Sequence, residues 1–192
     1  MPETNAERGP APSDRPNVVL VFVDDLGYGD LGCFGSPYIE TPNIDQMASE
    51  GAKYTSFYTG APICTPSRAA LMTGSYPTRV GLEEGVLFPD DDEGLHPDEV
   101  TMADLLAEQG YATPCIGKWH LGDREPFLPT NHGFDHYLGI PYSNDMGAGQ
   151  SGGEYRDLPL MRDTETVEAP VDQTTLTRRY TEEAVEFIED NA

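Results

Sequence analysis

A cysteine, a proline and an arginine at close spacing mark the segment 63–74 as a place where chemistry could occur. Cys64 lies two residues before Pro66 and four before Arg68, and an apolar stretch then runs to Gly74. Pro66 suits the first position of a helix, and Gly74 suits the residue just past its end. Cys64 is therefore expected at the start of a short helix, whose backbone N–H groups and dipole attract negative charge. Arg68 adds a forked cation suited to tetrahedral oxyanions, although a core helix with an inert cysteine is the alternative.

A lysine and a histidine alternate with a tryptophan in the segment 117–122, which follows a predicted strand. The alternation predicts that Lys118 and His120 face one way and Trp119 the other. A cation and a titratable imidazole directed at one site suit anion binding combined with proton transfer. The alternative is that both are ordinary surface residues.

Two adjacent aspartates, Asp24 and Asp25, directly follow the apolar, β-branched run 18–23. Such a run is typical of a strand that is buried on both faces of a parallel sheet. α/β proteins bind their ligands at the carboxyl ends of such strands. The two carboxylates would repel each other unless a cation lay between them, and a hard divalent metal is the natural partner. The pattern alone leaves a metal site and a solvated turn both open.

Together these segments resemble the sulfatase family, and its arylsulfatases in particular. Residues 64–74 match the family signature Cys-x-Pro-Ser-Arg followed by Ala-x-Leu-x-Thr-Gly, and residues 117–122 match its Gly-Lys-Trp-His-Leu-Gly motif. Residues 26–32 resemble the sequence that follows the metal-binding aspartates of the family. Residues 139–143, Gly-Ile-Pro-Tyr-Ser, resemble an arylsulfatase motif that ends in Ser143. The resemblance extends from about Asn17 to the last residue.

The resemblance implies an α/β fold of the alkaline-phosphatase-like kind, with a mainly parallel sheet, helices on both faces and a C-terminally incomplete domain. Residues 17–192 would form the N-terminal part of a sulfatase catalytic domain, and residues 1–16, rich in proline and polar residues, a disordered tail. The implied reaction is hydrolysis of a sulfate ester, which could be a small molecule, a sulfated glycan or a sulfated lipid.

In the family the signature cysteine is oxidised to formylglycine, so the resemblance implies this modification at Cys64 and a formylglycine-generating enzyme as a partner. The hydrated aldehyde would attack sulfur, which divides one difficult step into two. Calcium, or alternatively magnesium, would be held by Asp24, Asp25 and residue 64. The resemblance also assigns Arg68 to holding the nucleophile and His120 to proton transfer.

By the same resemblance, Lys118 and Ser143 would bind the sulfate group. Calcium requires about six to eight oxygen ligands, and Asp24, Asp25 and residue 64 supply only part of that set. The later metal and sulfate ligands of the family have no counterpart between residues 147 and 192. Three interpretations stay open: a sulfatase, an inactive fragment or half of a split enzyme that needs a C-terminal complementing chain, and a phosphate or phosphonate ester hydrolase of the same fold.

Composition limits the class of partner. The 192 residues carry a formal net charge of −23, from 34 acidic and 11 basic side chains. This charge argues against nucleic acid or an anionic membrane as a partner, and it fits either a high-salt habitat or a merely acidic protein. Three widely spaced cysteines suggest no disulfide framework. No segment is apolar enough for a membrane span and no signal peptide is evident, so a cytoplasmic location is expected.

Hydrophobic patterning predicts the elements that position these residues. Helices are expected over 41–51, 63–74, 101–110 and 175–191. Strands are expected over 18–23, 52–59 and 111–116. The stretch 147–172 is glycine-rich and then acidic, which predicts an extended loop.

Overall fold

The computed structural model describes residues 15–150 and 154–191, and most of the predicted tail 1–16 lies outside these residues. The chain divides into two compact units, one formed by Pro16–Tyr58 and the other by the chain from Thr59 onward. Each unit has its own internal contacts and is described separately.

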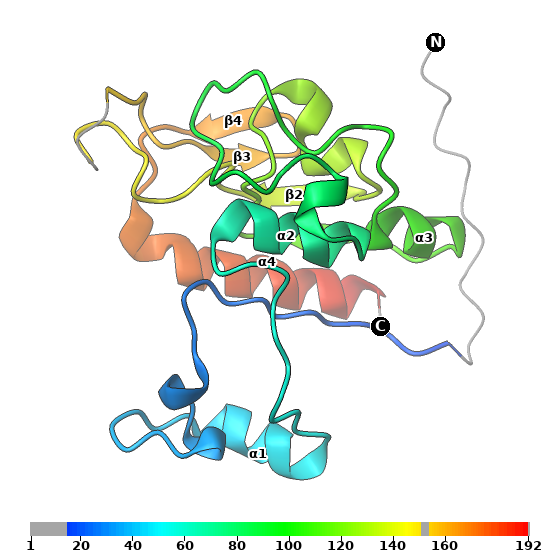
Figure 1. Ribbon diagram of the computed structural model, residues 1–192, viewed down its shortest axis with the longest axis vertical. Coiled ribbons are helices and arrows are strands. Elements are labelled where there is room, and N and C mark those ends of the chain that lie inside the picture. The colour runs from blue at the N-terminus through cyan, green and yellow to red at the C-terminus, as the bar shows by residue number, and fades with distance from the viewer. Residues whose placement is uncertain (1–14, 151–153, 192) are drawn as a thin grey trace. The chain divides into compact units, whose positions relative to one another are not determined.

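The unit from Thr59 onward contains a four-stranded mixed sheet with the strand order β1-β2-β3-β4. The first pair is parallel, with Cys115 opposite Tyr137, and the other two pairs are antiparallel. β2, β3 and β4 lie side by side in Figure 1. The strands are β1 Pro114–Ile116, β2 His136–Gly139, β3 Leu160–Arg162 and β4 Glu165–Glu168.

Apolar side chains pack on both faces of this sheet. Tyr137 and Leu138 are consecutive residues of β2, yet they belong to two different buried clusters. Since successive strand residues point to opposite faces, the two clusters lie on opposite sides of the sheet. Helix α2 (Cys64–Thr73) contributes Ala69 to the first cluster, and α4 (Leu176–Asn191) contributes Leu176 to the second. Helices therefore cover both faces, as predicted, and Figure 1 shows α4 running along the strands.

Helix α2 confirms most of the prediction made for the segment 63–74. Gly74 follows its last residue with a left-handed φ of 64°, and its N–H donates to the Ala70 carbonyl at 2.9 Å. The prediction that Pro66 occupies the first helical position is wrong, because the helix begins at Cys64. Pro66 is the third residue, where its missing N–H still costs no intrahelical bond.

The helices predicted over 101–110 and 175–191 are also confirmed. Helix α3 (Met102–Glu108) begins with a capping box, in which the Thr101 side chain accepts from the Asp104 backbone and the Asp104 side chain accepts from the Thr101 backbone. Helix α4 matches the range expected near the C-terminal end. The strand predicted over 111–116 forms only over its last three residues, as β1. The unit's described 3-10 turns are η3 Pro77–Arg79, η4 Glu125–Phe127, η5 Pro129–Asn131 and η6 Gln173–Thr175.

The extended loop predicted over 147–172 is wrong in its second half, because β3 and β4 form a tight hairpin there. Arg162 pairs with Glu165 across the turn, and Asp163 in the turn adopts a left-handed φ of 54°. Leu160 is fully buried in the core. Strands of three and four residues are too short to show an alternating pattern, which is why the sequence did not indicate them.

The unit Pro16–Tyr58 contains helix α1 (Pro42–Glu50), as predicted, and two 3-10 turns, η1 (Tyr28–Asp30) and η2 (Gly32–Phe34). The strand predicted over 18–23 is wrong: no strand forms over these residues, and Val21 is 78% exposed. The strand predicted over 52–59 is irregular too. A β-strand exists only through hydrogen bonds to a neighbour, and the described residues of this unit provide no strand to pair with.

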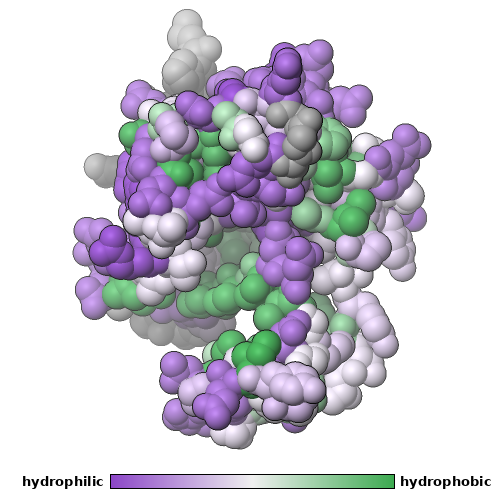
Figure 2. All heavy atoms as spheres, turned by 90° about the vertical axis from the view of Figure 1, so that its left-hand side faces the viewer, coloured by the Kyte–Doolittle hydropathy of each residue, from purple (hydrophilic) through white to green (hydrophobic). Residues whose placement is uncertain are grey.

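The surface has the polar character that the composition predicts. Hydrophilic residues cover much of the face shown in Figure 2, interrupted by patches of hydrophobic ones. Within the described residues, no helix is both long enough and apolar enough to cross a membrane.

Candidate active site

Cys64 is the first residue of α2, and no side chain caps the helix start before it. Its thiol is free of any disulfide and half-buried. Arg68 lies one turn further along the same face of the helix. The uncapped N–H groups of the first turn and the Arg68 guanidinium together give this end of α2 a positive local potential.

Two hydrogen bonds attach the first turns of α2 to the segment after β1. The Arg68 Nη1 donates to the Lys118 carbonyl at 2.5 Å, and the Thr65 hydroxyl donates to the His120 carbonyl at 2.9 Å. Both acceptors are backbone atoms, so the attachment fixes the path of the segment 118–120. It therefore brings the two predicted cationic motifs, about fifty residues apart in sequence, to one place.

The segment after β1 continues alongside the end of β2. The Trp119 N–H donates to the Ile140 carbonyl at 3.0 Å, and the His120 N–H donates to the Pro141 carbonyl at 3.1 Å. This pairing carries Lys118 to Ser143, where the Lys118 ammonium donates to the Ser143 hydroxyl at 3.2 Å. The resemblance had assigned these two side chains to one sulfate group, and the structure places them within hydrogen-bonding distance.

His120 has an unusual backbone and a buried ring. Its φ is 60°, a left-handed conformation that is uncommon for a residue other than glycine, and its exposed fraction is 1%. The ring Nε2 lies 2.9 Å from the Leu87 carbonyl oxygen. Because a carbonyl only accepts, Nε2 carries the hydrogen, and any proton that His120 takes up or releases in a reaction passes through Nδ1. The alternation predicted for residues 118–120 stops at this left-handed residue.

Burial changes the ionisation of two groups near Arg68. Burial raises the pKa of the Cys115 thiol to about 12, although the positive charge of Arg68 acts in the opposite direction. Burial likewise raises the pKa of the Tyr137 hydroxyl well above its usual value. Both groups therefore stay protonated near neutral pH. Cys115 is thus no competitor for Cys64 as a reactive sulfur.

Asp24 and Asp25 belong to the unit Pro16–Tyr58 and are exposed, with Asp25 at a left-handed φ of 54°. Their carboxylates have the chemistry that a hard cation prefers. Across residues 15–150 and 154–191, however, no group of three or more histidine, cysteine, aspartate or glutamate side chains could hold a metal ion. Asp24 and Asp25 by themselves supply only part of the roughly six to eight oxygen ligands that calcium takes.

The structure thus brings together four of the predicted residues around the start of α2: Arg68, Lys118, His120 and Ser143. Sequence reasoning missed Thr65 and Leu87, which bind the backbone and the ring of His120. Thr65 carried a signal, since it is a hydroxyl residue next to the signature cysteine. Leu87 acts only through its backbone, and no sequence pattern could identify it.

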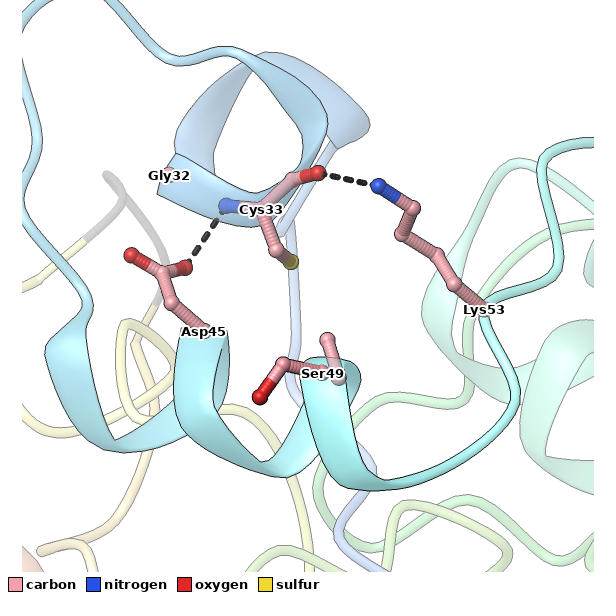
Figure 3. Close-up of a pocket in the computed structure, with 6 residues that line it drawn as sticks. Gly32, Cys33, Asp45, Ser49 and Lys53 are labelled. Carbon is pink, nitrogen blue, oxygen red and sulfur yellow. Dashed lines mark hydrogen bonds between the residues drawn. The ribbon is translucent and has the colours of Figure 1, made fainter.

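The unit Pro16–Tyr58 has a cavity of its own, of about 320 Å³, beside α1. Figure 3 shows the Cys33 side chain between Asp45 and Lys53. The Cys33 N–H donates to Asp45 at 2.6 Å, and the Lys53 ammonium donates to the Cys33 carbonyl at 2.7 Å. These bonds connect η2 to α1 and to the chain beyond it, which is a structural role. None of the predicted site residues lines this cavity.

The chain is similar in sequence to known proteins. A family model described as Sulfatase matches residues 16–192. Arylsulfatase A of Bos taurus is 54% identical over 145 residues, which cover 74% of this chain and 29% of that protein. Arylsulfatase G of Rattus norvegicus is 41% identical and covers 94% of this chain and 39% of that protein. The chain therefore spans less than half the length of either relative.

The folds are similar as well. The crystal structure of PsFucS1 sulfatase from Pseudoalteromonas sp. superposes with a TM-score of 0.71 at 32% sequence identity. The match covers 88% of this chain and 39% of that protein's chain.

Proposed function

The chain belongs to the sulfatase family, and from this premise we propose that it hydrolyses sulfate esters with a nucleophile made from Cys64. It corresponds to the N-terminal part of the sulfatase domain and has that family's alkaline-phosphatase-like α/β fold. Because the chain spans under a third of arylsulfatase A, its activity, substrate and partners are all part of the proposal.

The observation that carries this proposal is the cluster at the start of α2. The Lys118 ammonium and the Ser143 hydroxyl lie 3.2 Å apart, and Arg68 is bonded to the backbone of Lys118. Two cations and a hydroxyl beside an uncapped helix start supply charge and hydrogen-bond donors for a tetrahedral oxyanion. A sulfate ester needs this kind of site, since negative charge builds up on its oxygens as the ester bond breaks.

The proposal gives each residue one task. Lys118 and Ser143 hold the oxygens of the sulfate group, and Arg68 holds the residue at position 64 in place. His120 accepts or donates a proton at Nδ1, because its Nε2–H is bonded to Leu87. Formylglycine at position 64 would supply the attacking oxygen.

A metal ion has a narrower place in the proposal. Asp24 and Asp25 are the residues that would hold calcium or magnesium, but the described residues lack the further ligands that either ion requires. We therefore assign no step of the reaction to a metal. Sulfated small molecules, glycans or lipids are the proposed substrates, and a formylglycine-generating enzyme is the proposed partner.

The test is turnover of an aryl sulfate by the purified chain, produced together with a formylglycine-generating enzyme and assayed with calcium or magnesium. We expect mass spectrometry to find an aldehyde in place of the thiol in the peptide that contains Cys64. The Cys64→Ala variant should be inactive, and Cys33→Ala should retain activity. An unmodified Cys64 would overturn the proposed nucleophile.

The same assay addresses the remaining interpretations. Absence of turnover by the chain alone, restored on adding a C-terminal chain, would show that the chain is half of a split enzyme. Faster turnover of a phosphonate ester than of the matched sulfate ester would move the proposal to the other class of hydrolase.

A further inference from the structure

Three buried residues from distant parts of the chain form a closed cycle of hydrogen bonds beside the signature cysteine. The Thr65 hydroxyl donates to the His120 carbonyl at 2.9 Å. The His120 ring donates through Nε2 to the Leu87 carbonyl at 2.9 Å. The Leu87 N–H then donates back to the Thr65 hydroxyl oxygen at 3.2 Å. Each of the three residues is both a donor and an acceptor in the cycle.

Because the cycle is buried, its hydrogen bonds are costly to break. The exposed fractions of Thr65 and His120 are both 1%, and that of Leu87 is 8%. A buried polar group that loses its partner is left without water to replace it, so each bond of the cycle resists opening. The Leu87 carbonyl in particular would lose its bond to the ring if the His120 proton moved from Nε2 to Nδ1.

From this geometry we infer that Thr65 is a positioning residue that fixes the tautomer and orientation of His120. The Thr65 hydroxyl holds the backbone of His120 through one bond and the backbone of Leu87 through the other. Leu87 in turn holds the ring with its hydrogen on Nε2. Nδ1 is thereby reserved for proton transfer, and the ring is ordered before substrate arrives.

Thr65 suits this task because its hydroxyl can donate and accept at the same time. Its methyl group and β-branched stem also restrict the rotation that would take the hydroxyl away from its partners. A valine at this position would keep the shape of the side chain but could make neither bond. A serine would keep both bonds but lose the methyl group.

The inference concerns His120 in the proposed function, yet its first test does not depend on turnover. Nitrogen NMR of the histidine rings reports which nitrogen carries the hydrogen. In the wild-type chain we expect the Nε2–H tautomer for His120, and finding the Nδ1–H tautomer would overturn the inference. This measurement requires no variant, so it stands even if a substitution prevents folding.

The variants then test the role of Thr65. In Thr65→Val we expect the two ring nitrogens of His120 to shift toward each other as the tautomers mix, whereas Thr65→Ser should keep the wild-type signals. His132 is a matched control, since it is fully buried outside the cycle and burial lowers its pKa, and its signals should not move. Unchanged His120 signals in Thr65→Val would overturn the inference.

Measuring turnover by the same variants tests whether the orientation of His120 affects the proposed reaction. General acid–base catalysis contributes about 10²–10⁴-fold, so losing the ordered ring should lower kcat of Thr65→Val on an aryl sulfate at least about tenfold with little change in KM. Thr65→Ser should restore kcat. A tautomer shift in Thr65→Val without loss of kcat would show that His120 is not the proton-transfer group. An inactive wild-type chain with the expected tautomer would count against the proposed function while leaving the positioning role intact.

Discussion

Replacing Gly139 with alanine tests how the site is assembled. A Cβ atom at this position would lie 1.8 Å from the Gly117 carbonyl oxygen, whereas real Cβ atoms stay beyond 3.0 Å from such neighbours. The backbone of β2 and the segment after β1 would have to separate by at least about 1 Å. The bonds at risk are Gly117 N–H to Leu138 carbonyl, 2.8 Å, and Trp119 N–H to Ile140 carbonyl, 3.0 Å. Each contributes about 0.5–1.5 kcal/mol net, and overpacking adds a similar amount, so we expect a loss of roughly 2–4 kcal/mol.

Urea unfolding measures this loss. With a slope of about 2 kcal/mol per molar urea for a small protein, the midpoint should fall by about 1–2 M. Gly29→Ala is the matched control, because its Cβ would meet nothing within 4 Å and its φ is ordinary, so its midpoint should stay near that of the wild type. A Gly139→Ala midpoint equal to that of the control would refute the parallel pairing that carries Lys118 to Ser143.

Three further predictions concern charge and packing. Arg162 binds Glu183 through two bonds of 2.6 and 2.9 Å and holds the pKa of Glu183 below its usual value of 4.5. The Arg162–Glu183 ion pair therefore stabilises the fold above pH 4.5, and this stabilisation is lost as the pH falls through the lowered pKa of Glu183. When the free energy of unfolding is measured at decreasing pH, Glu183→Gln should lose less stability than the wild type. Trp119→Phe removes the indole bond to the Phe127 carbonyl, 2.8 Å, and should lower the free energy of unfolding by roughly 1–3 kcal/mol in urea. Raising salt from 0.1 to 1 M shortens the screening length from about 10 to 3 Å. The net charge of −23 should then repel an aryl sulfate less, so we expect its KM to fall. A rise in KM would show that attraction by the local cations outweighs this repulsion.

The sequence predicted the local elements that carry the site better than it predicted the sheet. The end of α2 at Gly74 and the existence of α3 were readable from the sequence, because each depends on residues within a few positions of one another, whereas the first residue of α2 was misplaced by two positions. The bond from Arg68 to the backbone of Lys118 was not predicted, because the family resemblance only assigned both residues to one site. Nothing in the residue pattern states which backbone carbonyl a side chain will reach.

The failed strand prediction over 18–23 and the failed loop prediction over 147–172 have a common cause. The run 18–23 has the composition of a buried strand, yet the Val19 side chain is 70% exposed in the unit Pro16–Tyr58. Conversely, β3 and β4 form from a stretch with no visible alternation. Strand formation depends on the presence of a partner at long range, and the composition of a segment does not supply one. Helix α4, whose helical backbone hydrogen bonds join residues of the same segment, was predicted over nearly its full length.

The division of the chain into two units separates the chemical tasks of the proposed site. The hydrogen bonds described above that hold His120 and join Lys118 to Ser143 lie in the unit from Thr59 onward. The carboxylates of Asp24 and Asp25 belong to the other unit, which has its own internal bonds between η2 and α1. Since net repulsion opposes any anionic substrate, the cations Arg68 and Lys118 are the first feature that the proposed reaction requires.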